Sequence, residues 1–121
     1  MKPSAINLTD KLAQFTDHWA PKVIAEMNNY QFKLVKIQGE FVWHSHPDTD
    51  EVFVVIDGEL NIAFRDGVVR LNAGEMVVVP KGVEHKPFAN RECNVMLIEP
   101  KGVINTGEAE STLTAENDIW I

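Results

Sequence analysis

Three histidines and one glutamate are the residues of this sequence whose types and spacing could do chemistry. His44 and His46 are two residues apart, Glu51 begins the next apolar run, and His85 follows another apolar run further along the chain. Side chains at positions i and i+2 of a β-strand point to the same face, so His44 and His46 are expected to project together. Imidazole and carboxylate groups without a thiolate suit a divalent transition metal such as Fe, Mn, Ni, Zn or Cu. The pattern therefore predicts one such ion held by His44, His46, Glu51 and His85.

The same four side chains could instead only pack and hydrogen-bond with one another. Burying a carboxylate without a cation is costly, and this favours the metal site. Four protein ligands leave one or two positions of an octahedral ion open, which a catalytic or ligand-binding metal requires. Structural zinc sites, by contrast, are usually closed and rich in cysteine. Strand parity gives Glu40 the same inward direction as the histidines, so Glu40 is the candidate general base.

Two stretches around these residues resemble the sequence motifs of the cupin family. The first motif runs glycine, His-x-His, glutamate, glycine, and its matches are Gly39, His44, His46, Glu51 and Gly58. The second runs glycine, Pro-x-Gly, histidine, and its matches are Gly74, Pro80, Gly82 and His85. Gly39 stands one residue closer to the histidine pair than is usual in the family, and Ala89 takes the place of a family asparagine that is found one residue later, at Asn90. Neither departure touches a predicted ligand.

The resemblance implies a small single-domain cupin with a jelly-roll β-barrel and a metal held by the four residues named above. It implies a metal-dependent enzyme acting on a small organic substrate, with oxygenases as the leading subclass and isomerases as the next. A non-catalytic cupin that binds or senses a small ligand is the alternative, because a fold does not determine a substrate. The resemblance also implies a homodimer. Phe41 and Trp43 are expected on the outer side of their strand, where an apolar patch would mark an interface.

Short runs of alternating or apolar residues, separated by turn residues, predict an all-β fold. Asp57-Gly58 and Asp66-Gly67 are strong hairpin signals. An apolar stripe of helical spacing predicts a short helix near residues 9–17. We expect one domain over residues 1–121, with the barrel at about 22–100 and an irregular tail at 101–121 whose apolar end docks back on the domain. The predicted strands are residues 23–27, 30–38, 40–46, 52–56, 59–65, 68–71, 76–79 and 94–99.

Composition limits the classes of partner. The chain has 121 residues and a net charge of −7, so phosphate backbones are repelled and no nucleic-acid partner is expected. Its apolar runs are far too short to span a bilayer, and the N-terminus does not resemble a signal peptide. The single cysteine, Cys93, excludes an internal disulfide and is expected to be a buried or half-buried thiol. A lone cysteine suits a reducing compartment, so we expect a cytoplasmic protein.

Overall fold

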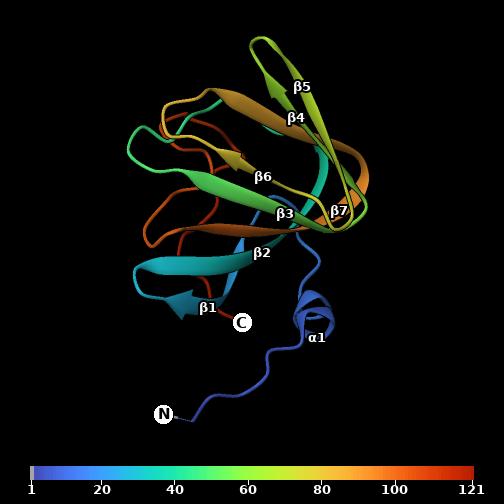
Figure 1. The fold of residues 1–121 in the computed structure, drawn as a ribbon, viewed down its shortest axis with the longest axis vertical. Helices are drawn as coiled ribbons and strands as arrows, with labels where there is room; N and C mark the ends of the chain where they lie inside the picture. The colour runs from blue at the N-terminus through green and yellow to red at the C-terminus, as the bar shows by residue number, and fades with distance from the viewer. Residues whose placement is uncertain (1) are drawn as a thin grey trace.

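A computed structural model describes residues 2–121, which form antiparallel strands and one short helix (Figure 1). The strand order of the main sheet is β1-β2-β7-β3-β6, and β4 pairs with both β7 and β5. The all-β prediction is confirmed, and the arrangement is that of a jelly roll whose barrel is not closed. The elements are α1 (Leu8–Leu12), β1 (Lys22–Met27), β2 (Tyr30–Glu40), β3 (Glu51–Asp57), β4 (Glu59–Phe64), β5 (Gly67–Asn72), β6 (Met76–Val79) and β7 (His85–Pro100).

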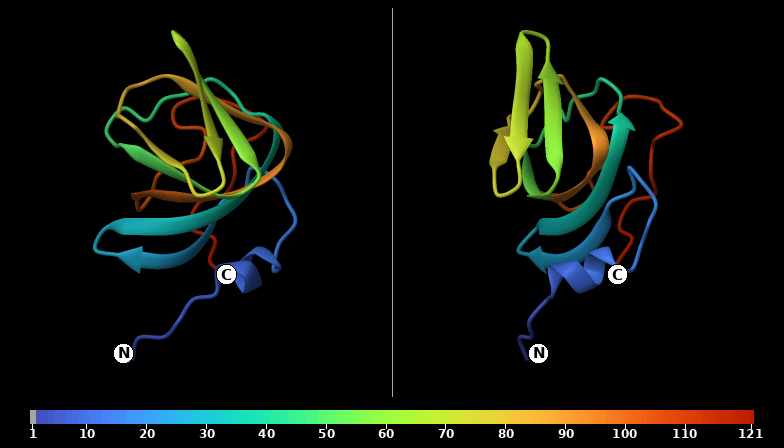
Figure 2. Two further views of the ribbon diagram at one scale, coloured as in Figure 1. Left: turned by 45° about the vertical axis from the view of Figure 1, so that its right-hand side comes forward. Right: turned by 90° about the vertical axis from the view of Figure 1, so that its right-hand side faces the viewer.

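The long strand β7 joins the two parts of the fold. Its first residues, His85 to Phe88, pair with β4, and the stretch from Cys93 to Pro100 pairs with β2. The strand curves between the main sheet and the β4–β5 hairpin (Figure 2). Only residues 94–99 were expected as a strand here, because Pro87 and the charged residues around position 91 interrupt the apolar pattern. Ladder bonds to two different partners maintain the strand through that region.

The inner face of the sheet and the hairpin enclose an apolar core. Val35 and Ile37 of β2 share it with Val95 and Leu97 of β7 and with Phe53 of β3, and all five side chains are buried. Cys93 is fully buried and unpaired, as predicted. The core side chains come from strands that are far apart in the sequence. The core therefore forms only when the whole jelly roll folds.

The segment that follows β2 departs from the sequence prediction. Residues 40–46 were expected to form a strand separated from β2 by Gly39. Instead β2 continues to Glu40 through a bulge at Gly39, whose φ of 81° favours glycine. The chain beyond it is irregular except for a single antiparallel bridge between His44 and His85. The regular alternation expected over residues 40–46 is therefore not maintained.

Phe41 and Trp43 do not form the outer aromatic patch that was expected. Phe41 is 8% exposed and stacks on Trp19 in the core, with ring centroids 4.6 Å apart. Trp43 is half-buried beneath the guanidinium of Arg65, 3.8 Å from the ring centroid. The physical reason is the bulge at Gly39 and the irregular backbone after it, because the regular alternation of a strand does not continue past Glu40.

The helix is shorter than the stripe that predicted it. It covers only Leu8–Leu12, and Asn7 caps it by accepting a hydrogen bond from the Asp10 N–H. Phe15 and Trp19 are nevertheless buried, although neither is helical. Their burial comes from packing against the sheet. Among residues 2–121 there is no helix with the length and apolar character needed to cross a membrane.

The C-terminal tail, residues 101–121, docks on the domain as expected. Near its end, Val23 of β1 donates a backbone hydrogen bond to Ile119 and accepts one from Ile121, at 2.7 and 3.2 Å. Further back, the side-chain amide of Asn105 donates to the carbonyl oxygen of Trp19 at 2.9 Å. Thr106 is 1% exposed. The tail has little regular structure, but it is packed along much of its length.

Candidate metal centre

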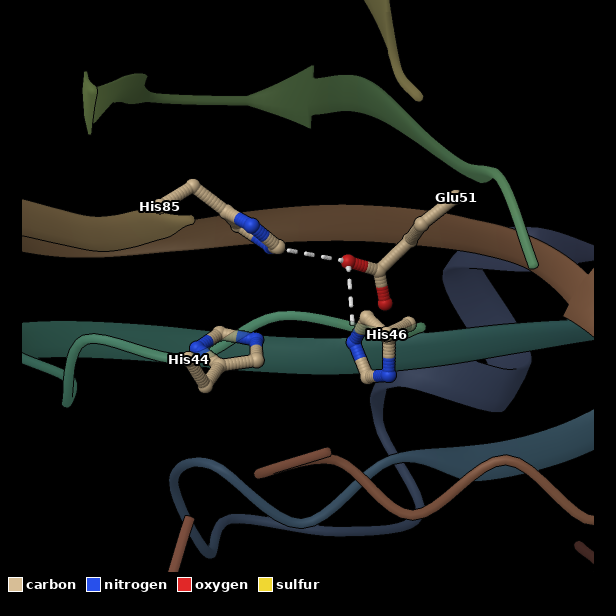
Figure 3. A group of neighbouring side chains, drawn as sticks. All are labelled: His44, His46, Glu51 and His85. Carbon is tan, nitrogen blue, oxygen red and sulfur yellow. Dashed lines mark hydrogen bonds and ion pairs between the residues drawn. The ribbon is translucent and has the colours of Figure 1, made fainter. Parts of the chain in front are cut away.

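Three separate parts of the chain bring the four predicted ligands together. His44 and His85 form the isolated bridge after β2, with their backbone N–H groups each donating to the other's carbonyl at 3.0 and 2.9 Å. His46 lies two residues further along, and Glu51 is the first residue of β3. All four side chains point toward a common centre (Figure 3). Each is at most 5% exposed, so the cluster is shielded from solvent.

Backbone hydrogen bonds orient two of the imidazoles. The Nδ1 atoms of His44 and His85 lie 2.9 Å from the carbonyl oxygens of Val42 and Val83, each two residues before its histidine. A carbonyl oxygen can only accept, so Nδ1 carries the proton in both rings. The neutral tautomer then leaves Nε2 with a free lone pair. Carbonyl bonds of this kind are the usual support of a metal-binding histidine.

The donor atoms of the cluster fit a metal ion. One ligand atom from each of the four residues lies within 4.8 Å of all the others. Ligand atoms about 2.1 Å from an ion lie at most about 4.2 Å apart, so a small contraction closes the site. The Nε2 atoms of His46 and His85 face Glu51 Oε1 at 3.6 and 3.3 Å, and buried His46 Nε2 has no hydrogen-bond partner. A cation between these acceptors satisfies all of them at once.

Proton affinities in the cluster favour the forms that bind a metal. Burial, together with the nearby His85, lowers the pKa of His44 to about 4, so its ring is neutral at pH 7. Burial alone would raise the pKa of Glu51. The imidazoles of His46 and His85 beside it outweigh that effect and hold the pKa of Glu51 below its ordinary value. The centre therefore presents a neutral imidazole and a carboxylate near neutral pH.

A small apolar cavity lies next to the cluster. Its volume is about 30 Å³, which is room for one or two water molecules. His44 and Glu51 form its polar side, and the tail contributes Asn105. The rest of its lining is Trp19, Pro21, Val35, Ile37, Phe41, Phe53 and Pro87.

Comparisons with known proteins agree with this geometry. The model of the cupin domain family matches residues 32–99, more than half of the chain. The chain belongs to the cupin family. The four clustered residues of this cupin all lie inside the matched region.

Curated relatives of this cupin come from a bacterium and a plant. It is 42% identical over 64 residues to the uncharacterized Bacillus subtilis protein YdbB, a match covering 52% of this chain and 57% of YdbB. A match to a putative germin-like protein 9-2 of Oryza sativa subsp. japonica covers 23% of that protein, so the chain spans less than two thirds of either curated relative.

Solved structures share the fold over most of the chain. A cupin-2 domain containing protein from Shewanella frigidimarina is 66% identical, with a TM-score of 0.79, over 79% of this chain and 94% of its own. Protein NMB1881 from Neisseria meningitidis is 36% identical, with a TM-score of 0.74, over 81% of this chain and all of its own. A hydroquinone 1,2-dioxygenase, PnpCD, is 20% identical with a TM-score of 0.64 over 76% of this chain and 70% of its own, a likeness of fold alone.

Glu40 does not lie at the centre of this cupin, contrary to the parity argument. Its side chain is 68% exposed and its Oε1 pairs with Lys86 Nζ at 2.6 Å on the surface. The bulge at Gly39 sits between Glu40 and the regular part of β2, so parity does not carry across it. We therefore withdraw Glu40 as the general base.

The sequence prediction missed two charged residues that the fold buries behind the cluster. Lys33 and Glu99 are 3% and 1% exposed, and Lys33 Nζ donates to Glu99 Oε1 at 2.9 Å. Charged residues on a strand are normally interpreted as its solvent-facing side, so the charge of Lys33 gave no reason to expect it in the core. The available signal was parity, because Lys33 has the same parity as Val35 and Ile37 of the core.

Proposed function

We propose that this cupin is a metal-dependent enzyme that acts on a small organic substrate, with oxygenase-like chemistry. The observation that carries the proposal is the buried group of three imidazoles and one carboxylate beside an apolar cavity. His44, His46, Glu51 and His85 would hold the ion. A bound Fe(II) or similar ion would supply Lewis-acid and redox chemistry at positions the protein leaves open. The aromatic walls would keep water away from that position.

The lining of the cavity favours oxygenase-like over isomerase chemistry. An isomerase needs an acid and a base beside its substrate in addition to the metal. Among the described residues that line the cavity, only His44 and Glu51 titrate, and both belong to the metal cluster. The surface position of Glu40 removes the one further base that had been considered. Redox chemistry at a metal places no such demand on the surrounding side chains.

A substrate larger than water reaches this centre only if the walls of the cavity move. A second cavity of about 230 Å³ lies on the outer side of His46, between residues 46–49 and the C-terminal tail. Gly102, Val103, Ile104, Gly107 and Glu108 form its tail side. The tail therefore lies between solvent and the cluster, and its displacement would join this outer cavity to the centre. We propose this as the route of substrate entry.

Oxygen uptake is the direct test of this function. Protein stripped of metal and reloaded with Fe(II) should consume oxygen with at least one member of a panel of catechols, thiols and diketones. His44→Ala should lose both the metal and the activity, whereas Glu40→Gln should retain both. A wild type that binds no stoichiometric metal contradicts the proposal at its base. A wild type that binds metal and panel compounds without turnover supports the alternative, a ligand-binding or sensing cupin.

We also propose that two copies of this cupin associate through the outer face of the main sheet. Across β2, β7, β3 and β6, the paired residues of two neighbouring rows are all apolar on this face. Met76 and Val78 of β6 are 56% and 51% exposed. The rows are Phe32, Ile98, Val52 and Val78, and Leu34, Met96, Val54 and Met76. Leu34 is fully buried against Phe15, with α1 packed beside it, so the free part of this face lies toward β3 and β6.

Charge selects a second copy as the occupant of this face. The chain carries a net charge of −7, and none of it lies in these two rows. Two copies that meet here join apolar surface to apolar surface while their acidic regions stay apart. Val78→Lys should convert the dimer to a monomer in sedimentation experiments. Val68→Lys, at a similarly exposed valine on β5, should leave the dimer intact, and a monomeric wild type at micromolar concentration would contradict the proposal.

A further inference from the structure

A buried ion pair stands behind the metal ligand Glu51. On the inner face of the sheet, the register of β3 and β7 pairs Val52 with Ile98, which puts Glu99 across from Glu51. Both residues are buried, at 3% and 1% exposed, so their side chains are cross-strand neighbours on the same inner face. Glu99 Oε1 accepts from Lys33 Nζ at 2.9 Å, and Lys33 is itself 3% exposed. A continuous buried line therefore runs from Lys33 through Glu99 to Glu51.

The fold alone does not require this pair. Burying two charges costs more desolvation energy than their attraction usually returns, and apolar side chains of similar size are often at least as stabilising. The neighbours on the same inner face, Val35 and Leu97, are such side chains. Glu99 Oε2 is also buried without a hydrogen-bond partner among the described residues. A partly satisfied charge in a core is expected where it acts on a neighbouring group.

We propose that Lys33 and Glu99 are positioning residues that fix the carboxylate of Glu51 in the orientation needed by the metal. Lys33 anchors Glu99 through a charge-assisted hydrogen bond. Glu99, held in this way, restricts the rotation of the Glu51 side chain. The imidazoles of His44 and His85 are oriented by backbone carbonyls. No comparable backbone bond to the Glu51 side chain is found among residues 2–121, so the ion pair supplies for the carboxylate what the carbonyls supply for the rings.

The lysine also connects the centre to the C-terminal tail. Lys33 Nζ lies 3.4 Å from the carbonyl oxygen of Val103, in addition to its bond with Glu99. Val103 lines the outer cavity through which substrate is proposed to enter. The same ammonium group therefore contacts both the support of Glu51 and the segment that covers the cluster.

The inference rests on the proposed metal binding, and its test is binding of cobalt(II) alone, with no substrate. The double variant Lys33→Met/Glu99→Leu removes one positive and one negative charge, so the net charge near the ion stays the same. We expect it to fold with a melting temperature close to that of the wild type. Its cobalt(II) dissociation constant should rise roughly tenfold or more, the usual effect of removing a support of a metal ligand. Its cobalt absorption spectrum should also change, because the orientation of one ligand is no longer fixed.

A matched control separates positioning from general loss of a buried polar group. Asn61 of β4 is 4% exposed and its side chain accepts from Arg70, away from the cluster. Asn61→Leu should bind cobalt(II) with the affinity and spectrum of the wild type. If Lys33→Met/Glu99→Leu does not fold, Lys33→Met/Glu99→Gln keeps the shape of residue 99, is again charge-neutral, and should weaken cobalt(II) binding in the same direction.

The outcomes are distinct. A double variant that matches the wild type in cobalt(II) affinity and spectrum overturns the positioning role while leaving the metal site intact. A wild type that binds no cobalt(II) overturns the proposed function, and the positioning role falls with it. If Asn61→Leu weakens cobalt(II) binding as much as the double variant does, the positioning role is also overturned. The loss of affinity would then reflect reduced stability of the core.

Discussion

Replacing Gly107 by alanine is expected to lift the C-terminal tail from the metal centre. Gly107 has a φ of 59°, and a Cβ placed there overlaps the backbone carbonyl oxygen of Ser45 and lies 3.4 Å from His46 Nδ1. The carbonyl belongs to the segment that carries the two histidines, so it cannot move aside without disturbing the cluster. Relief requires the tail to shift by about 1 Å, which is the difference between overlap and van der Waals contact.

The size of the effect follows from strain and overlap together. A non-glycine residue in the left-handed region costs about 1 kcal/mol, and displacement of the tail adds at least as much again. Destabilising the closed tail by about 2 kcal/mol raises the population of open molecules roughly thirtyfold. Metal bound at the cluster should therefore become accessible to a chelator roughly that much faster, as long as opening limits the rate.

The assay is the rate at which excess chelator removes cobalt(II) from the loaded protein, followed by absorbance. Gly102→Ala is the matched control, since Gly102 lies in the same tail with a φ of 92° but its added Cβ would meet nothing within 4 Å. We expect release from Gly107→Ala to exceed release from Gly102→Ala by about fivefold, which corresponds to the roughly 1 kcal/mol that overlap adds to the strain common to both variants. Equal rates in the two variants would refute the reasoning, because strain without overlap would then explain the whole effect.

Three further predictions concern pH, the cysteine and the end of the chain. The folded pKa of His44 is about 4 against 6.5 when unfolded, so the unfolded state binds the extra proton between those values. As the pH falls from 6.5 to 4, the free energy of unfolding of the metal-free wild type should therefore decrease by up to about 3 kcal/mol more than that of His44→Gln. Urea titrations at each pH measure this free energy, and an equal decrease in the two proteins would contradict the prediction. Burial raises the pKa of Cys93 to about 11, so a thiol reagent at pH 8 should react only after unfolding, and rapid labelling of native protein would count against the buried thiol. Deleting residues 119–121 removes two backbone bonds to Val23 and should lower the free energy of unfolding by about 2 kcal/mol, which calorimetry measures; an unchanged melting temperature would show that the docked end contributes nothing.

Prediction of strands and turns from local sequence patterns was accurate where the chain is regular. The hairpin predicted at Asp66-Gly67 is confirmed, because β4 and β5 pair on either side of it. Asp57-Gly58 also connects two strands, but the hairpin predicted there is wrong, since β3 and β4 pair with other strands and not with each other. The bounds of β3, β4 and β5 are nearly those predicted. β6 was predicted at the residues it occupies. Such elements depend on contacts between residues close in sequence, so composition and alternation are sufficient to find them.

Prediction failed at the places where distant strands impose the conformation. β7 begins nine residues before the predicted start because β4 pairs with its first part, and no local pattern records that partner. Glu40 is exposed and Phe41 is buried, while His44 and His46 still face inward, because the bulge at Gly39 and the irregular chain after it end the regular alternation of the strand. A glycine in a strand indicates that a bulge is possible there. It does not predict which face of the sheet the following side chains point toward.

For this cupin the sequence by itself determined the chemistry at the centre: the types, number and spacing of His44, His46, Glu51 and His85 are visible before any fold is known. Tertiary structure alone decided what surrounds them. The burial of Lys33 with Glu99, the exposure of Glu40 and the tail over His46 all depend on which strand lies beside which. The physical reason is that the identity of a ligand belongs to one residue, whereas burial and orientation belong to pairs of residues that the chain brings together only on folding.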